Sequence, residues 1–249
     1  MSKRDIFGLE FDLGSLEDAV AWVMEHSALP ASYVVTPNLD HFRRWEGDPH
    51  FRSLYRHAGL TVLDGTPLVW LARRQGARAT RITGVDLVEK AFAAASRSSV
   101  PIAIVGGEPG TAESAASNLL ATYPGLSVVF TGSPTADDLR DPGYLALLAD
   151  AFSDYPELIV ALCVGSPKQE QLAFDLQELG ATGAYLCVGA AVDFFAGRFN
   201  RAPRIVQRLG FEWVYRMAQE PRRLFKRYFV GGLFFLPYAA RTVFRARSE

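Results

Sequence analysis

A short apolar run, Leu60–Leu63, ends abruptly in Asp64, Gly65, Thr66 and Pro67. This order of residue types is typical of a strand that turns into the start of a helix. Because open α/β sheets bind ligands at the carboxyl ends of their strands, an aspartate in this place points into the ligand crevice. Asp64 is therefore our candidate for a reactive carboxylate. In the alternative interpretation, Asp64 only forms an Asp-Gly turn and caps the next helix.

Three further polar residues stand near the ends of predicted strands. Thr36 and Asn38 lie where the apolar run Tyr33–Thr36 ends, with Pro37 between them. They place a hydroxyl and a carboxamide at the mouth of the predicted sheet, although either side chain can simply cap the helix that follows. Arg81 stands just ahead of another predicted helix start. Since most arginines are solvated surface residues, that remains the alternative for Arg81.

A glycine turn, Gly106 and Gly107, separates a predicted strand from a predicted helix, which is where nucleotide phosphates bind in many α/β proteins. The surrounding sequence lacks the full G-x-G-x-x-G spacing, so it is a weak dinucleotide motif. A turn that lets a helix begin close to the sheet explains these glycines equally well.

A second turn has the sequence Gly-Ser-Pro-Lys-Gln-Glu. Gly165 permits a tight turn, Ser166 can cap a helix, and Pro167 suits the first helical position because its missing N–H costs nothing there. Lys168 and Gln169 would then project from a helix N-terminus toward the same crevice. That location suits an anion.

The last predicted core strand runs into small residues that include Gly189, followed by an isolated acid, Asp193. The small residues leave room beside the backbone, and a pair of ribose hydroxyls is a natural partner for such an acid. Alternatively, Asp193 caps a helix or forms a salt bridge with Arg198.

These residues need a framework, and the apolar pattern supplies one in which short strands alternate with helices. The predicted strands are Ile6–Phe11, Tyr33–Thr36, Leu60–Leu63, Pro101–Val105, Ser127–Phe130, Leu158–Val164 and Ala184–Val188. The predicted helices include Leu16–Met24, Leu39–Arg56, Val85–Ala95, Ala112–Thr122, Tyr144–Phe152 and Gln169–Leu179. The fold class is therefore α/β, with a mostly parallel, Rossmann-like, doubly wound sheet that helices cover on both faces. The first strand alternates less convincingly and is expected at an edge or in a hairpin.

Length and composition favour one large domain with an appendage. The chain has 249 residues, 49% of them hydrophobic, which is enough to bury a full core. We expect an α/β catalytic domain over residues 1–200 and a helical appendage over residues 201–249. Cys163 and Cys187 lie in apolar runs and are expected to be buried free thiols in a reducing compartment. No secretory signal is evident, so we expect the protein to be cytoplasmic.

The net charge of −1 hides a strong asymmetry along the chain. Residues 201–249 contain eleven basic and three acidic residues, whereas the first 200 contain 15 basic and 24 acidic ones. Basic side chains cluster at residues 222–227, between aromatic and apolar ones, which predicts an amphipathic helix that lies in a membrane interface. For residues 222–240 we favour this interpretation over a helix whose apolar face packs on the core.

Several of these strings together resemble one family, the WecG/TagA/CpsF glycosyltransferases. They are Thr36-Pro37-Asn38, Leu63-Asp64-Gly65, Arg81-Ile82-Thr83-Gly84-Val85-Asp86, Gly165-Ser166-Pro167-Lys168-Gln169-Glu170, Arg201-Ala202-Pro203 and Glu212-Trp213-Val214-Tyr215-Arg216. The likeness spans nearly the whole chain in the right order. It implies transfer of a sugar, with inversion, from a UDP-sugar to a polyprenyl-diphosphate-linked acceptor glycan during synthesis of a bacterial cell-surface polymer.

The resemblance also implies roles for particular positions. Asp64 matches the proposed base, and Thr36, Asn38, Arg81 and Gln169 match positions that line the active site. Asp193 matches the position that holds the nucleotide. The family's tail is thought to bring arginines to the diphosphate, and our matches are Arg216, Arg223 and Arg227, with Lys226 a rival to Arg227. Proline at position 37 is a departure that stiffens the turn between Thr36 and Asn38.

The chemistry of inversion agrees with this assignment, because a single displacement needs only one base. The departing UDP needs a metal or fixed positive groups to meet its charge. Glu10-Phe11-Asp12 is the nearest approach to the Asp-x-Asp metal triplet of many sugar-nucleotide enzymes. None of the four histidines, His26, His41, His50 and His57, has metal-ligand spacing. We therefore expect catalysis without a metal site and without a cofactor.

Two other functions are compatible with parts of the sequence. One is a Rossmann-like enzyme that uses a nucleotide cofactor, such as a methyltransferase or dehydrogenase; the other is a non-enzymatic membrane adaptor. Nucleic-acid binding is disfavoured because the first 200 residues are acidic and the aromatic residues of the tail lie on one face. The expected partners are thus a UDP-sugar, a lipid-linked acceptor and the anionic inner face of the cytoplasmic membrane. The donor sugar (N-acetylmannosamine, its uronic acid or glucose), the acceptor glycan and homo-oligomer formation are left open.

Overall fold

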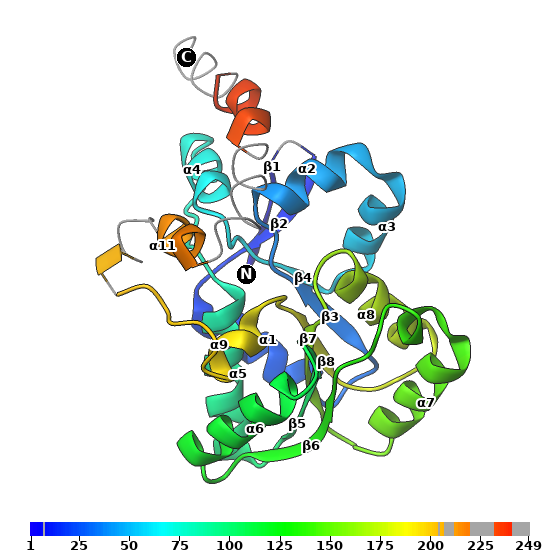
Figure 1. Cartoon of the computed structure of the whole chain (residues 1–249). Helices are drawn as coiled ribbons and strands as arrows, with labels where there is room; N and C mark the ends of the chain where they lie inside the picture. Colours follow the sequence, from blue (N-terminus) through cyan, green and yellow to red (C-terminus); the bar gives the residue numbers. More distant parts are fainter. Residues whose placement is uncertain (7, 204, 207–211, 220–231, 241–249) are drawn as a thin grey trace.

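The computed structural model describes residues 1–6, 8–203, 205–206, 212–219 and 232–240. Within these residues, six parallel strands form one sheet in the order β4-β3-β8-β7-β5-β6. The strands are β3 (Ser32–Val35), β4 (Leu60–Thr61), β5 (Pro101–Gly106), β6 (Ser127–Gly132), β7 (Ile159–Cys163) and β8 (Ala184–Cys187). The predicted Rossmann-like α/β fold is confirmed (Figure 1).

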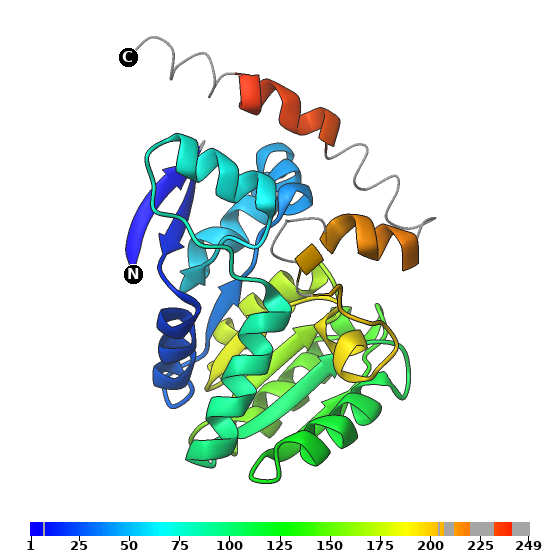
Figure 2. The ribbon, with the colours of Figure 1, turned by 90° about the vertical axis from the view of Figure 1, so that its left-hand side faces the viewer.

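Helices cover both faces of this sheet (Figures 1 and 2). The helices are α1 (Leu16–His26), α2 (Leu39–Gly47), α3 (Pro49–His57), α4 (Thr66–Arg74), α5 (Gly84–Ser98), α6 (Thr111–Thr122), α7 (Pro142–Ser153), α8 (Lys168–Glu178), α9 (Ala191–Phe195) and α11 (Glu212–Gln219), with a short 3-10 helix at Asp138–Arg140. One core lies between the sheet and α2, α3, α4, α7 and α8. The other lies between the sheet and α1, α5, α6 and α9. Neighbouring residues of a strand alternate between the two cores, for example Tyr33 and Val34.

The first predicted strand, Ile6–Phe11, is wrong as a single element. The structure has an antiparallel hairpin of β1 (Ser2–Ile6) and β2 (Leu9–Leu13) instead, as one of our alternatives expected. Its turn contains Gly8 at a φ of +91°, a conformation that glycine adopts without steric cost. The Gly8 N–H donates to the Asp5 carboxylate at 2.9 Å.

The predicted helix Leu39–Arg56 is also wrong, because it is two helices. Pro49 is the first residue of α3, and the residue before a proline avoids helical backbone angles. Asp48 therefore ends α2 and caps α3, accepting hydrogen bonds from the N–H groups of His50 and Phe51. The remaining long helices and the strands of the sheet agree with the prediction, apart from shifts at their ends.

A further helix, at residues 232–240, lies against α2 and α4 (Figures 1 and 2). Phe234 and Tyr238 contact the Phe42 ring edge-on, and Phe235 contacts Trp70 in the same way. This side of the helix packs on the protein, which is the alternative that the sequence left open. Leu233 and Leu236 point outward, 62% and 60% exposed. Among the described residues, no helix combines the length and the apolar character needed to cross a bilayer.

Candidate functional site

The carboxyl ends of β4, β3, β8 and β7 meet at one edge of the sheet. The helix after β3 packs on one face of the sheet, whereas α9, the helix after β8, packs on the other. Between two such strands the connections diverge and leave a crevice, which is the usual ligand site of an open α/β sheet. The residues that follow these strands therefore lie where a ligand is expected to bind.

Asp64 and Arg81 lie side by side at this edge. Arg81 Nε donates to the backbone carbonyl of Asp64 at 2.9 Å and lies 3.8 Å from Asp64 Oδ1. The Ile82 N–H bonds to the carbonyl of Leu63 at 2.8 Å, so the segment before α5 runs alongside the end of β4. Both side chains of the pair are 26% exposed, which leaves them accessible to a ligand.

The turn that contains Asn38 packs against the turn that contains Asp64. The Asp64 N–H bonds to the carbonyl of Pro37 at 3.3 Å. A Cβ placed on Gly65 would lie only 3.2 Å from the Cα of Asn38, so glycine permits this close approach. Asn38 caps α2 through its side-chain oxygen, which accepts from the Asp40 N–H at 3.0 Å. The capping role that the sequence left open for Asn38 is thus observed.

Thr36 and Gln169 lie at the same edge, but their polar atoms are used within the protein. Thr36 is 8% exposed and donates its hydroxyl to the carbonyl of Cys187 at 3.2 Å, which links β3 to β8. Gln169 is 3% exposed. Its Oε1 accepts from the Gly189 N–H at 2.8 Å, and its Nε2 donates to Glu170 at 3.1 Å. Both residues therefore brace the turns of the site.

The second predicted turn differs in detail from our expectation. Gly165 has a φ of +81°, as the tight turn requires. Pro167, rather than Ser166, occupies the N-cap position of α8, and the hydroxyl of Ser166 is buried with no hydrogen-bond partner among the described residues. The prediction that Ser166 caps this helix is wrong. Lys168, the first residue of α8, is exposed.

The Gly106–Gly107 turn follows β5, the strand that pairs with β7. Both glycines have positive φ, +124° and +85°. A Cβ on Gly106 would lie 2.4 Å from the backbone of Cys163, and one on Gly107 would lie 2.9 Å from Thr111. The two glycines therefore allow α6 to start close to the sheet, which is the alternative that the sequence gave for them.

An open hollow adjoins this turn, between the start of α6 and the end of α9. It is lined by Glu108, Pro109, Gly110, Thr111, Ser114, Ala196 and Arg198. Arg198 donates to the Thr111 hydroxyl at 2.8 Å and lies 3.7 Å from Asp193 Oδ1. Asp193 is thus in the salt bridge that the sequence offered as an alternative, beside a hollow at a helix N-terminus whose lining includes one arginine, Arg198, and one acid, Glu108.

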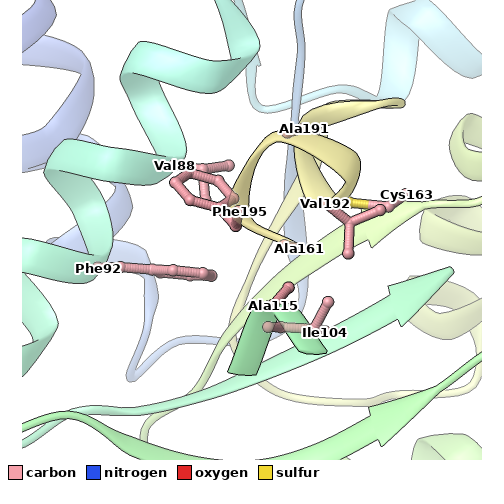
Figure 3. A pocket seen from close by; sticks show the side chains of 9 residues that line it. All are labelled: Val88, Phe92, Ile104, Ala115, Ala161, Cys163, Ala191, Val192 and Phe195. Atoms are coloured by element: carbon pink, nitrogen blue, oxygen red, sulfur yellow. The ribbon is translucent and has the colours of Figure 1, made fainter. Parts of the chain in front are cut away.

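A second gap, of about 10 Å³, is a packing void rather than a ligand site (Figure 3). Its lining residues are Val88, Phe92, Ile104, Ala115, Ala161, Cys163, Ala191, Val192 and Phe195. These side chains offer almost no polar partner to a water molecule, so the gap is expected to be dry. Cys163 and Cys187 are buried free thiols, as predicted, and burial raises the pKa of Cys163 to about 12.

The arginines expected to come from the appendage lie outside the described residues. This applies to Arg223 and Arg227, and to the side chain of Arg216, whose backbone belongs to α11. The start of the appendage is described, since Gln219 of α11 bonds to both backbone groups of Asn200 at 3.1 and 3.3 Å. Among the residues that the structure describes, no group of three histidine, cysteine or acidic side chains is placed to hold a metal ion.

Sequence reasoning missed two residues behind the site, Glu170 and His41. Glu170 is 1% exposed, and its Oε1 lies 3.6 Å from His41 Nε2. Burial raises the pKa of Glu170 to about 7, against the hydrogen bond from Gln169 and the charge of Arg44. The available signal was the spacing of Asn38 and His41, because His41 Nδ1 accepts the Asn38 N–H at 3.3 Å in a capping box.

The fold and the site together define a class of protein. A doubly wound α/β protein with a carboxylate, an arginine and an amide at the mouth of its sheet has the architecture of a Rossmann-like enzyme. Residues 4–249 match the model of the "Glycosyl transferase WecG/TagA/CpsF family". The chain belongs to this family, so the resemblance seen in the sequence is confirmed. The protein is accordingly a glycosyltransferase, which moves a sugar from a donor to a glycan acceptor.

Proposed function

We propose that this protein is an inverting, metal-independent glycosyltransferase that uses a UDP-sugar donor and a polyprenyl-diphosphate-linked glycan acceptor. It would act at the inner face of the cytoplasmic membrane in the synthesis of a cell-surface polysaccharide. The observation that carries the proposal is the Asp64 carboxylate beside Arg81, in a turn packed against that of Asn38. N-acetylmannosamine, its uronic acid and glucose are the donor sugars to test.

In this proposal Asp64 is the general base. The acceptor hydroxyl attacks the anomeric carbon of the sugar, and Asp64 takes the hydroxyl proton as the new C–O bond forms. The bond between the anomeric carbon and the phosphate oxygen breaks, and its electron pair leaves with UDP. One displacement inverts the anomeric configuration. Arg81, held to the backbone of Asp64, supplies a fixed positive charge beside the reacting groups.

The leaving diphosphate needs positive groups that are already in place. The hollow at the start of α6 offers the helix N-terminus and Arg198, next to Asp193, our candidate for the ribose contact. The exposed Lys168 at the first position of α8 is a further candidate, and Arg216, Arg223 and Arg227 would add charge from the appendage. These positions support a diphosphate-binding role without a bound metal.

The appendage supports the proposed membrane location. It carries eleven of the 26 basic residues of the chain, and anionic lipid attracts such residues. The helix at residues 232–240 adds two leucines that face away from the protein. Basic charge next to exposed apolar side chains is the chemistry of an interfacial segment.

The experiment that tests the proposal replaces Asp64 by asparagine. Asp64→Asn keeps the size of the side chain and removes its basicity, so turnover should fall by about 10²- to 10⁴-fold. Transfer is followed by mass spectrometry of a lipid-linked acceptor incubated with a panel of UDP-sugars. Folding and UDP affinity should stay unchanged. The matched control is Asp137→Asn, which changes an aspartate that is 95% exposed and remote in sequence from the site.

Three results would contradict the proposal. Full turnover by Asp64→Asn would show that Asp64 is not the base. Protection against thermal unfolding by a dinucleotide or S-adenosylmethionine, but not by UDP, would indicate a cofactor enzyme. Loss of activity in chelator that Mg²⁺ or Mn²⁺ restores would overturn metal-independent catalysis.

A further inference from the structure

The carboxylate of Glu170 is buried directly behind the site, where an acid is costly to keep. It is 1% exposed, and its Oε2 has no hydrogen-bond partner among the described residues. The hydroxyl of Ser166 favours the ionised carboxylate but does not reach hydrogen-bond geometry. A glutamine or an apolar residue of similar size would fill the same volume at a lower cost. The cost suggests that the negative charge has a use.

The first partner of Glu170 is the carboxamide of Gln169, which it orients. Gln169 donates its Nε2 hydrogen to Glu170, and its Oε1 accepts from the Gly189 N–H. If the amide were flipped, two donors would face each other at Gly189 and two acceptors would face each other at Glu170. The carboxylate therefore fixes the amide, and the amide fixes the turn after β8. That turn leads into α9, which carries Asp193.

The second partner of Glu170 is His41 in the first turn of α2. Because His41 Nδ1 accepts the Asn38 N–H, the ring proton must reside on Nε2, which faces Glu170 Oε1 at 3.6 Å. The carboxylate thus also faces the turn after β3, which packs against Asp64 and Gly65. One buried acid is shared between two turns of the site.

We propose that Glu170 is a positioning residue: by accepting a hydrogen bond from Gln169 and by its charge beside the ring of His41, it holds the turns after β3 and β8 in the arrangement that catalysis needs. Its effect on turnover rests on the proposed function. Its effect on the geometry of the turns does not, since the contacts stand in the protein without substrate.

The surroundings of Glu170 allow its charge to change near neutral pH. Among the residues that the structure describes, the charged or titratable groups that face it are His41 and Arg44 of α2, Tyr55 of α3, Tyr33 of β3 and Cys187 of β8. Burial raises the pKa of both tyrosines and of the thiol, so they stay neutral. Arginine stays positive. Histidine is the other residue type that commonly titrates in this range, so His41 is tested beside Glu170.

The first experiment measures the turns directly by hydrogen exchange of the full-length chain, without substrate. In Glu170→Gln, which resembles the protonated acid at every pH, the Gly189 amide should exchange about tenfold faster than in the wild type at pH 8, where the wild-type carboxylate is ionised. Glu178→Gln serves as the control, since it removes a charge from the exposed end of the same helix. Equal exchange at Gly189 in all three proteins would overturn the inference, whether or not the proposed function is correct.

The second experiment compares pH profiles of kcat/KM for the UDP-sugar. In the wild type kcat/KM should rise with pH through about 7, where Glu170 ionises. In Glu170→Gln it should be flat from pH 6 to 8, and about tenfold below the wild type at pH 8. If Glu170 had only a structural role, Glu170→Gln would avoid burying a charge and would be the more stable protein at pH 8, and its kcat/KM would equal that of the wild type. An unchanged pH profile in Glu170→Gln would overturn the inference.

Two further variants keep the result interpretable. In His41→Gln, kcat/KM should still rise near pH 7. If the rise is absent from His41→Gln but present in Glu170→Gln, the titrating group is His41 and the inference is wrong. In Gln169→Met the side chain at position 169 cannot donate a hydrogen bond to Glu170, so the pH profile of kcat/KM should also be flat. This variant replaces Glu170→Gln as the test if Glu170→Gln does not fold. A wild type without UDP-sugar transfer would contradict the proposed function, and the exchange measurement would then decide on Glu170 alone.

Discussion

Two acids at one edge of the sheet show how surroundings divide the roles of a single functional group. Asp64 is 26% exposed and lies next to a guanidinium, so a substrate hydroxyl can reach its oxygen. Glu170 is 1% exposed and faces an amide and an imidazole that belong to the protein. The first is suited to accept a proton from a ligand. The second is suited to hold other side chains in place.

The burial of Glu170 predicts a dependence of stability on pH. Its pKa rises from the ordinary value of 4.5 to about 7, so between these values the folded chain holds a proton that the unfolded chain has lost. The stabilising contribution of the protonated acid is therefore complete below about pH 4.5 and is lost as pH rises through about 7. A shift of this size is on the order of 3 kcal/mol.

Denaturant unfolding of the wild type and Glu170→Gln between pH 5 and 8 measures this dependence. The difference in the free energy of unfolding between the wild type and Glu170→Gln should change by on the order of 3 kcal/mol. The wild type should lose stability relative to the variant as pH rises. The comparison cancels titrations that the two proteins share. A difference that stays constant over this range would contradict the burial of an ionisable carboxyl group at position 170.

Glu170 also shows why single residues of the site resist prediction from sequence. In the string Gly165–Glu170 it stands among lysine and glutamine residues, which normally face solvent. It is buried because α2 and α3 pack over the start of α8, bringing His41 and Tyr55 toward it from far along the chain. Asp64, in contrast, was found because the end of an apolar strand and a glycine turn mark its position locally.

At the scale of elements, the sequence correctly predicted the helices and strands whose burial depends on their own residue pattern. The strands of the sheet and helices such as α5 follow from apolar periodicity, since their burial depends on their own pattern. The break between α2 and α3 has a local signal, Asp48-Pro49, but the apolar pattern continues across it and by itself predicts one helix. The pairing of β1 with β2 requires a turn at Gly8, and a run of apolar residues alone does not reveal that turn.

A second element-scale feature is the attachment of the segment after α9 to α5. Arg201 Nη2 lies 2.7 Å from Asp86 Oδ1, and Nη1 lies 3.4 Å from Glu89 Oε2. Asp86 also accepts the hydroxyl of Thr83, the N-cap of α5, at 2.6 Å. Arg201 thereby ties the beginning of the appendage to the helix whose preceding residues include Arg81.

Arg201→Ala should therefore weaken both the attachment and the start of α5. The side chain is 24% exposed and has two acidic partners, so its loss should destabilise the protein by about 1 to 3 kcal/mol. Hydrogen exchange should become faster in the first turn of α5. The control is Arg140→Ala, which removes an arginine that is 76% exposed and paired with Asp137. Equal effects of the two substitutions would show that the Arg201 contacts contribute no more than a surface pair.

For the molecule as a whole, charge is divided along the chain. The first 200 residues contain 24 acids and 15 bases, whereas residues 201–249 contain three acids and eleven bases. An acidic body would be repelled by an anionic membrane, and a basic appendage would be attracted. The appendage would thus orient the protein with its last 49 residues toward the lipid, while its helix at residues 232–240 packs on α2 and α4.

This arrangement predicts reversible, salt-dependent binding to anionic vesicles. Each basic residue near the surface contributes about 1 kcal/mol, so binding should weaken steeply as salt is added and should be absent with neutral lipid. Replacing Leu233 and Leu236 together by serine should weaken binding further, by at least about tenfold, because both side chains point away from the protein and can enter the interface. The matched control is Leu179→Ser, a leucine that is 50% exposed at the end of α8 and should have no effect. Sedimentation with vesicles at several salt concentrations measures all of these changes. Binding that ignored both salt and lipid charge, or that Leu179→Ser reduced as much as the double substitution, would show that the appendage is not the membrane-binding surface.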